Sequence, residues 1–262
     1  MSYARHRLGS PLARAAVVLG LAVFVFWSAA PIVWLVLSSV LEQKALIAQP
    51  PDLSLSNFTL QNYVTVLGSA AALGRGIMNS AIVAFFSTSV ALVLGAPAAY
   101  ALARLPIRRA NAMAFLILAT QMLPGIAIAI PLFIVISQIG LIDNVLSLGA
   151  VYLSFNRAAA VDGAGVIQTF RHIILPISIP PLTAAAVFAF IEAWNEFSFA
   201  LILTRQSAQT VPLVIAQFAG QYQTVFGQMM AAALISVAPV ILIAILFRDQ
   251  ILRGFADGMM KG

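Results

Sequence analysis

The chain has 262 residues, of which 62% are hydrophobic and 8% are charged, and its mean hydropathy is +1.01. Soluble domains carry roughly 25% charged residues, so this chain has too few polar groups to cover a globular surface in water. The composition excludes an ordinary soluble domain and places the chain in a bilayer. The net charge of +6 does not indicate a nucleic-acid partner, because the basic residues lie in short segments between apolar runs. The absence of cysteine excludes disulfides and thiolate metal sites.

The N-terminal part predicts a retained transmembrane helix. Residues 1–14 form a basic tail, and an uncharged run extends over residues 15–41. This run is too long for the apolar region of a cleavable signal, which has about 7–15 residues. A helix needs about 20 apolar residues to cross a bilayer. Four later runs reach that length: 76–103, 110–142, 173–204 and 207–247. The last run exceeds one span, so we expect a loop first and then a helix from about Phe226.

The segments between the runs predict the topology. Residues 42–75 form the largest polar connection and are expected outside the cell, with an amphipathic segment over 58–67 lying on the membrane surface. The transmembrane core is expected over 76–253, and a cytoplasmic tail over 254–262. Threading from a cytoplasmic start leaves 11 of the 14 Lys and Arg residues inside, as the positive-inside rule requires. Both termini are therefore expected in the cytoplasm.

This threading needs a further crossing between Asp143 and Arg157, where the sequence is short. Residues 145–156 number twelve, and twelve residues extend about 18 Å as a helix against a hydrocarbon core of about 30 Å. Either this element is a short, tilted or half-buried helix, or a piece of a normal span is absent. The prediction is an all-α, polytopic membrane helix bundle with five full transmembrane helices and a shortened fourth.

The stretch 157–176, RAAAVDGAGVIQTFRHIILP, concentrates charged residues between two apolar runs. Residues 158–162 favour a helix, Gly163 suits a left-handed helix cap, and Pro176 suits the first turn of the next helix. The pattern predicts a compact cytoplasmic knob that binds a soluble partner. An ordinary cytoplasmic turn with positive-inside charges is the alternative.

The order of residues in this stretch resembles the EAA loop of ABC-importer permeases, the cytoplasmic segment that docks on the ATP-hydrolysing subunit. The matching positions are Ala158, Ala159, Gly163, Ile173, Leu175 and Pro176. The Asp162-Gly163-Ala164 and Phe170-Arg171 forms are similar to the sugar-uptake branch related to maltose permeases. Further matching motifs lie along nearly the whole chain: Asn62-Tyr63, Asn79-Ser80, Ala98–Arg104, Leu123-Pro124, Pro131–Phe133, Gly140–Asp143, Ala193–Phe197 and Lys261-Gly262.

The resemblance implies a permease subunit of an ATP-binding-cassette importer in a bacterial inner membrane, which moves a sugar or sugar-like solute into the cytoplasm. The implied partners are a second permease subunit, two ATPase subunits, an external solute-binding protein and membrane lipid. The implied ATPase-coupling loop spans 157–175. Its residues are Arg157, Ala158, Ala159, Asp162, Gly163, Ala164, Phe170 and Arg171.

The chain departs from the family pattern in two ways at this loop. Arg157 stands where the family has a glutamate, which reverses the charge. The short fourth element implies that on the order of 20 residues are missing immediately before it. Both departures are interpreted as one deletion that ends at the loop, and we expect them to weaken docking to the ATPase.

Two carboxylates in the fifth predicted span are candidates for the substrate pathway. Glu192 and Glu196 are one helical turn apart and are expected on one face, and neither should face lipid because a charge at the bilayer centre costs about 2.5–3.5 kcal/mol. Trp194 and Asn195 add an aromatic ring and an amide, groups that suit sugar recognition. Alternatively the pair lies near the outer end in water, or Glu196 ties the helix to a neighbour.

The alternative class of function is a stand-alone secondary transporter or channel, which would use Glu192 and Glu196 for ion coupling. An enzyme is not expected, because His6 and His172 lie in basic segments without a metal-ligand spacing and no nucleophile–base constellation occurs. The sequence also lacks the phosphate-binding pattern GxxxxGK[ST], so ATP hydrolysis is expected on a separate subunit. No cofactor is expected.

Overall fold

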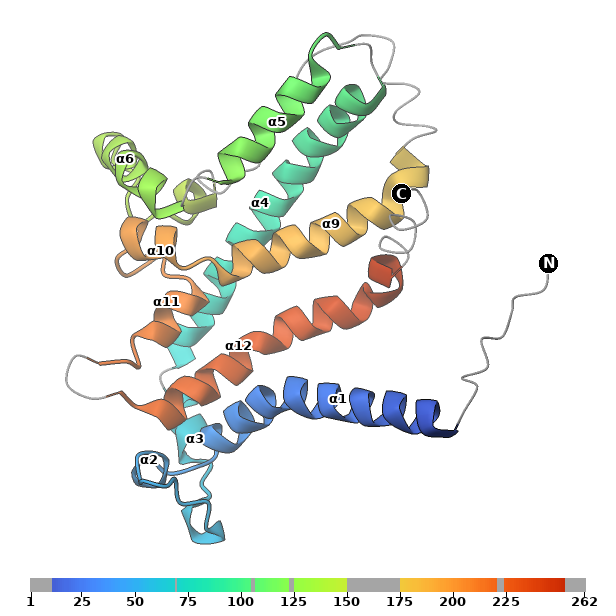
Figure 1. Ribbon diagram of the computed structural model, residues 1–262. Coiled ribbons are helices and arrows are strands. Elements are labelled where there is room, and N and C mark those ends of the chain that lie inside the picture. The colour runs from blue at the N-terminus through green and yellow to red at the C-terminus, as the bar shows by residue number, and fades with distance from the viewer. Residues whose placement is uncertain are drawn as a thin grey trace.

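The computed structural model describes residues 11–68, 70–104, 107–122, 125–149, 175–220 and 224–252. This part of the chain is helical, and its only β-type pairings are two isolated bridges, Leu41–Phe58 and Ala219–Thr224. The all-α fold is thereby confirmed. The helices, shown in Figure 1, are α1 (Pro11–Ser39), α2 (Gln43–Leu46), the 3-10 turn η1 (Leu55–Asn57), α3 (Gln61–Gly68), α4 (Ala70–Arg104), α5 (Ala110–Gln121), α6 (Gly125–Gln138), α9 (Leu175–Asn195), α10 (Ser198–Leu203), α11 (Val211–Ala216) and α12 (Phe226–Leu246).

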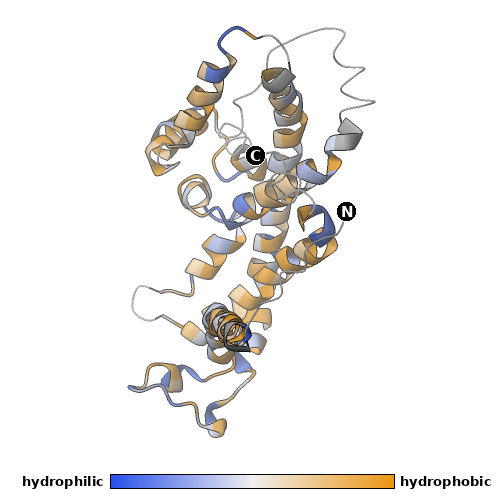
Figure 2. Cartoon of the chain, turned by 45° about the vertical axis from the view of Figure 1, so that its right-hand side comes forward, coloured by the Kyte–Doolittle hydropathy of each residue, from blue (hydrophilic) through white to orange (hydrophobic). Residues whose placement is uncertain are grey.

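Several helices are long and apolar enough to cross a membrane. Among the described residues these are Arg14–Ser39, Ala72–Leu102 and Phe226–Leu246, with a fourth if the bent pair α5–α6 counts as one span. Apolar residues run along the length of the helices (Figure 2), and many lie on the surface, as at Trp27, whose side chain is 78% exposed. A polytopic membrane bundle explains this exposure, because the bilayer is the solvent for these side chains. The full count of spans stays a prediction.

Two predicted spans are interrupted, which corrects the expectation of continuous helices. The run 110–142 forms α5 and α6, which are bent by 85° relative to each other. Pro124 lies between them in the sequence, and proline cannot donate the backbone hydrogen bond that a continuous helix needs. The run 173–204 forms α9 and α10, with a break after Asn195. By contrast, the predicted helix start near Phe226 is confirmed by α12, and α3 lies within the connection 42–75 as expected.

The helices converge at one end of the molecule, which we call the closed end, and diverge toward the other, the open end (Figure 1). At the closed end α1 and α9 finish and α4 and α12 begin. Helix α4 packs along α9, and α1 packs against α12. Burial is concentrated at the closed end: the buried residues of α12 lie within Gly227–Ser236, and the buried described residues of α1 are Ser38 and Ser39.

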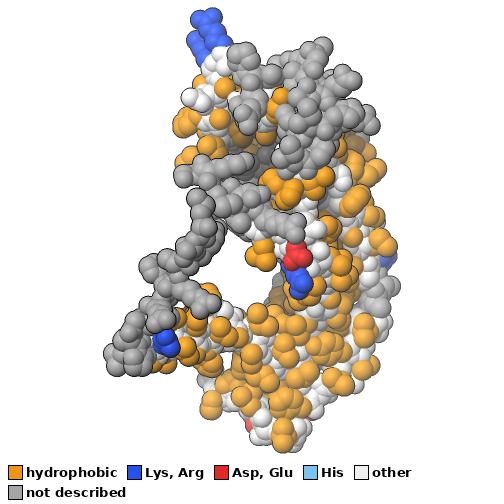
Figure 3. All heavy atoms as spheres, turned by 90° about the vertical axis from the view of Figure 1, so that its right-hand side faces the viewer, with side chains coloured by type: hydrophobic (Ala, Val, Ile, Leu, Met, Phe, Trp, Pro, Cys, Tyr) orange, Lys and Arg blue, Asp and Glu red, His pale blue; other side chains and the backbone are white. Residues whose placement is uncertain are grey.

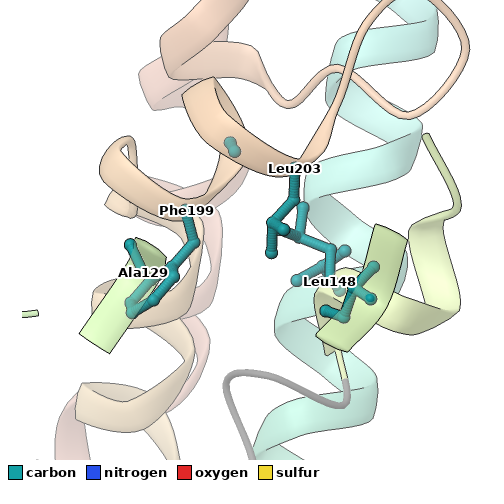
Figure 4. Packing of buried hydrophobic residues seen from close by; sticks show 7 residues of the cluster. Ala129, Leu148, Phe199 and Leu203 are labelled. Atoms are coloured by element: carbon teal, nitrogen blue, oxygen red, sulfur yellow. The ribbon is translucent and has the colours of Figure 1, made fainter. Parts of the chain in front are cut away.

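Buried apolar side chains from separate helices hold the closed end together. Figure 4 shows one cluster, in which Ala129 of α6 and Phe199 of α10 meet, and Leu148 lies beside Leu203. A second cluster joins Trp194 of α9 to α4 and α11. Elsewhere the described surface is largely apolar with few charged side chains, as Figure 3 shows for one face. The helices are therefore packed together at the closed end, and their surfaces beyond it are apolar, as expected for contact with lipid.

Candidate functional site

The predicted ATPase-coupling loop lies outside the described residues, which stop at residue 149 and resume at Leu175. This applies to Arg157, Ala158, Ala159, Asp162, Gly163, Ala164, Phe170 and Arg171. After the loop the described chain resumes with α9, which begins at Leu175 and has Pro176 in its first turn. Proline is tolerated there because the first-turn amides have no partner inside the helix. The helix start after the loop stays a prediction, because the residues before Leu175 lie outside the described part of the chain.

The substrate-pathway candidates lie around the end of α9. Trp194 is 3% exposed and packs in a cluster with Ala84 and Val211. Its ring stacks on that of Phe190, with ring centroids 5.7 Å apart. Glu192 and Asn195 are exposed on the same helix. The structure thus separates the four candidates: the indole is a packing group, whereas the polar side chains of Glu192 and Asn195 point away from that core.

Glu196 caps the short helix α10. One carboxylate oxygen accepts a hydrogen bond from the amide of Phe199 at 2.9 Å, and the other accepts from the amide of Ala200 at 3.4 Å. These amides lie in the first turn of α10, where they have no partner inside the helix. Because α9 ends at Asn195, Glu192 and Glu196 do not share a face of one helix, so that prediction was wrong. The cap stabilises the break in the chain.

Asp143 holds together two segments that are far apart in the sequence. Helix α6 ends at Gln138, Gly140 turns the chain with a φ of 70°, and Asp143 follows with a φ of 60°. Its Oδ1 accepts from the amides of Arg205 (2.9 Å) and Ala208 (3.0 Å), among others. Its Oδ2 accepts from the amide (3.0 Å) and the hydroxyl (2.7 Å) of Ser207. All of these partners lie between α10 and α11.

The electrostatics of Asp143 result from these bonds. Burial alone would raise the pKa of the carboxyl group, because it disfavours the charged form. The amide of Arg205, the hydroxyl of Ser207 and the amides of Ala208 and Ser207 outweigh burial and hold the pKa well below its ordinary value. Asp143 is therefore ionised at neutral pH, and its charge is neutralised by amide dipoles rather than by a basic side chain.

The segment 205–211, which we call the strap, is also held by α4. The Asn79 side-chain amide donates to the carbonyl oxygens of Ser207 (2.8 Å) and Gln209 (2.9 Å). The hydroxyl of Ser80 accepts from the amide of Val211 at 2.9 Å. Two adjacent polar residues in an apolar helix thus bind three backbone groups of the strap, of which the amide of Val211 is buried and would otherwise lack a partner.

A second polar contact joins α3 to the end of α1, and α12 packs against it. The Asn62 side-chain amide donates to the carbonyl oxygens of Ser39 (3.0 Å) and Leu41 (2.8 Å). The hydroxyl groups of Tyr63 and Ser39 are 2.8 Å apart. A Cβ atom added at Gly227 would lie 2.5 Å from Nδ2 of Asn62, so only glycine allows α12 to approach this closely.

Sequence reasoning identified Asn62-Tyr63, Asn79-Ser80 and Asp143 as motifs but gave them no role. The structure shows what they share: each binds backbone groups of another element at the closed end. The sequence signal that could have indicated these roles is a small polar residue within or next to an apolar segment, where its side chain can bind backbone groups of a neighbouring element. No group of three potential metal-ligating side chains lies among the residues that the structure describes.

Comparison with known proteins gives a consistent result. Residues 147–256 match the family described as "Binding-protein-dependent transport system inner membrane component". The chain is 32% identical to the trehalose/maltose transport system permease protein MalG of Thermococcus litoralis, over 255 residues that cover 88% of this chain and 91% of the relative. It is 33% identical to the trehalose transport system permease protein SugB of Mycobacterium tuberculosis, covering 79% of this chain and 84% of the relative.

The fold has a counterpart among solved structures. The crystal structure of a bacterial ABC transporter involved in the import of the acidic polysaccharide alginate contains a chain that matches with a TM-score of 0.67 at 19% identity. That match covers 95% of this chain and 99% of the other. The similarity in fold and the 32% identity across nearly the whole T. litoralis relative agree. The chain belongs to the family of inner membrane components of binding-protein-dependent transport systems.

Proposed function

We propose that the chain is a permease subunit of an ATP-binding-cassette importer that carries a sugar into the cytoplasm. The observation that supports this most directly is the 32% identity to a trehalose/maltose permease across 91% of that relative's length. Membership of the family and the apolar helices make the chain a multi-pass protein of the inner membrane. A di- or oligosaccharide is the solute class that the named transport systems of both relatives suggest.

The proposed role also defines the partners. We propose a second permease subunit, two ATPase subunits and an external solute-binding protein. The sequence lacks a GxxxxGK[ST] phosphate-binding pattern, which supports placing ATP hydrolysis on another chain. The diverging, apolar helices at the open end leave surfaces that lipid or a second subunit would cover.

We propose further that the open end faces the cytoplasm. The start of α1, the connection between α4 and α5 and the end of α12 all lie at the open end (Figure 1). These places carry Arg14, Arg108, Arg109 and Arg248 in the sequence. The positive-inside rule assigns such a cluster of arginines to the cytoplasmic side. The strap and the segment between α1 and α4 would then face the outside.

A deletion next to the coupling loop is the third part of the proposal. The alignment with the T. litoralis relative runs over 255 positions but takes in 88% of this chain, about 231 of its 262 residues. More than twenty aligned positions therefore have no residue in this chain. A gap of that size fits the shortfall of the fourth span, on the order of 20 residues. With Arg157 in place of the family glutamate, we expect weakened docking to the ATPase.

For the substrate pathway, we propose that Glu192 and Asn195 face the solute. Both are exposed in the single chain, at the end of α9, where the helix breaks. Trp194 fixes the helix against α4, and Glu196 fixes the break by capping α10. Hydroxyl groups of a sugar need polar partners of this kind in an otherwise apolar wall.

Reconstitution tests the proposal. The full chain, co-expressed with candidate permease, ATPase and binding-protein subunits, is placed in proteoliposomes and supplied with radiolabelled trehalose or maltose. Uptake is expected to require ATP hydrolysis, to stop with a non-hydrolysable analogue, and to survive a proton ionophore. Uptake by the chain alone that ignores ATP and collapses with the ionophore would instead establish the secondary transporter.

A further inference from the structure

The strap 205–211 is bound by side chains from two other parts of the chain. Asp143, after α6, binds its first half through the amides of residues 205–208. Asn79, in α4, binds its carbonyl oxygens at Ser207 and Gln209. The backbone amides of the strap thus donate to the carboxylate of Asp143, and its backbone carbonyls accept from the side-chain amide of Asn79.

The contact between Asp143 and the strap is a double one. Besides its carboxylate, Asp143 uses its own backbone: its carbonyl accepts from the hydroxyl of Ser207 in the strap at 3.0 Å, and its amide donates to the carbonyl of Leu203, at the end of α10 just before the strap, at 2.9 Å. A segment tied by main chain and side chain together has little freedom to slide. Because Asp143 has a φ of 60°, the residue also needs a side chain that tolerates the left-handed region.

Apolar packing continues on both sides of the strap. Before it, Leu203 of α10 lies in the cluster with Ile136 of α6 and with Leu148, which follows α6 in the chain. At its end, Val211 lies in the cluster with Ala84 of α4 and Trp194 of α9. The hydrogen bonds therefore bridge two packed clusters. Within the strap Ala208, Thr210 and Val211 are buried, so the bond to the amide of Ala208 from Asp143 is made at the edge of this buried part, where an unpaired amide is unfavourable.

We infer that the strap holds the closed end in one arrangement. Asp143 binds it to the chain after α6, and Asn79 binds it to the first third of α4. We call this arrangement the joint; the parts of the helices at the open end can move relative to it. Asp143 is a positioning residue in this joint. The inference rests on the proposed function. In an importer, a rigid closed end would let the helices move at the open end when the ATPase subunits act on it.

The test measures distances with spin labels on engineered cysteines, which is clean because the chain has none of its own. One pair, Met78→Cys and Gln138→Cys, reports on the joint from exposed positions of α4 and α6. A second pair, Ala99→Cys and Leu246→Cys, reports on the open ends of α4 and α12. Both pairs are measured in the full chain in nanodiscs, without partner subunits.

The joint pair is expected to give one narrow distance distribution, which Asp143→Asn broadens and Asn79→Asp broadens too. The matched control is Asp52→Asn, because Asp52 accepts hydrogen bonds only within its own loop, from Ser54 two residues away and from the nearby Asn57. Asp143→Asn should also lower the melting temperature by about 3 °C or more. A joint pair that is broad in the unmodified protein, or unchanged by both strap variants, overturns the inference.

The second arm uses the assembled transporter. Addition of ATP and vanadate is expected to shift the open-end pair and leave the joint pair unchanged, and a shift of the joint pair would overturn the inference. Failure of the chain to assemble with any ATPase would contradict the proposed function. The measurements in nanodiscs need no ATPase and would still test the joint. A failure of the proposed function and a failure of this inference are therefore distinguishable.

Discussion

At the scale of single residues, Gly227 of α12 lies against the side chain of Asn62 of α3 with no room for a Cβ atom. Asn62 cannot move aside easily, because its side-chain amide binds two backbone carbonyls, those of Ser39 and Leu41. A methyl group at position 227 would lie 2.5 Å from that amide nitrogen. Either α12 moves away from α3, or the hydrogen bonds of Asn62 break.

We therefore predict that Gly227→Ala destabilises the protein by about 1–3 kcal/mol, the usual cost of overpacking. The measurement is thermal unfolding of the purified full chain in detergent. Gly74→Ala is the matched control, since a Cβ there meets nothing within 4 Å and alanine is the better helix former. An equal effect of the two substitutions would show that Asn62 yields without cost.

The charge of Asp143 predicts a pH dependence of stability. The pKa of this carboxyl group is lowered in the folded protein from an ordinary value of 3.8. A lowered pKa means that the contribution to stability is complete above the ordinary value and is lost as the pH falls through the folded-state value. The difference in melting temperature between the unmodified chain and Asp143→Asn should stay constant from about pH 7 to pH 5 and shrink below about pH 4. Shrinkage already between pH 7 and pH 5 would contradict the assignment.

At the scale of elements, the two broken helices show where sequence reasoning succeeded and where it stopped. Hydropathy predicted the apolar runs well, because length and composition are local properties, and α12 begins at the predicted Phe226. The break after Asn195 was missed because Glu196 was interpreted as a residue inside a helix. Its partners, the amides of Phe199 and Ala200, lie in the first turn of a new helix only because the chain breaks after Asn195. Composition alone does not reveal that.

The cap of α10 predicts a difference between two substitutions of Glu196. Glutamine keeps one side-chain oxygen for the first-turn amides, so Glu196→Gln should retain stability and sugar uptake. Alanine removes the cap, so Glu196→Ala should lose about 1 kcal/mol. Thermal unfolding and uptake into proteoliposomes are the two measurements. Loss of uptake in Glu196→Gln at unchanged stability would instead mean that the carboxylate itself contacts the solute.

At the scale of the whole molecule, the same residues that resemble the family build the closed end. Asn62, Asn79 and Asp143 come from three separate motifs, and each fixes a backbone segment distant in sequence. Sequence reasoning identified the motifs by resemblance but could not assign their roles, because each role depends on a partner segment 21 to 130 residues away. The coupling loop is the opposite case: its role is implied by sequence, and its residues lie outside those that the structure describes.

The proposed deletion makes a prediction for the whole assembly. We expect Arg157 and the missing stretch to weaken docking together. Replacing Arg157 alone leaves the loop without its preceding span, and inserting the stretch alone leaves the loop with the wrong charge. We expect that inserting the corresponding stretch of the T. litoralis relative before residue 157, combined with Arg157→Glu, raises the affinity for the ATPase subunit about tenfold, equivalent to about 1.4 kcal/mol. Pull-down at graded ATPase concentrations measures this. Arg157→Glu without the insertion is the control, and a full gain from that single change would show that charge alone, and not the shortened span, limits docking.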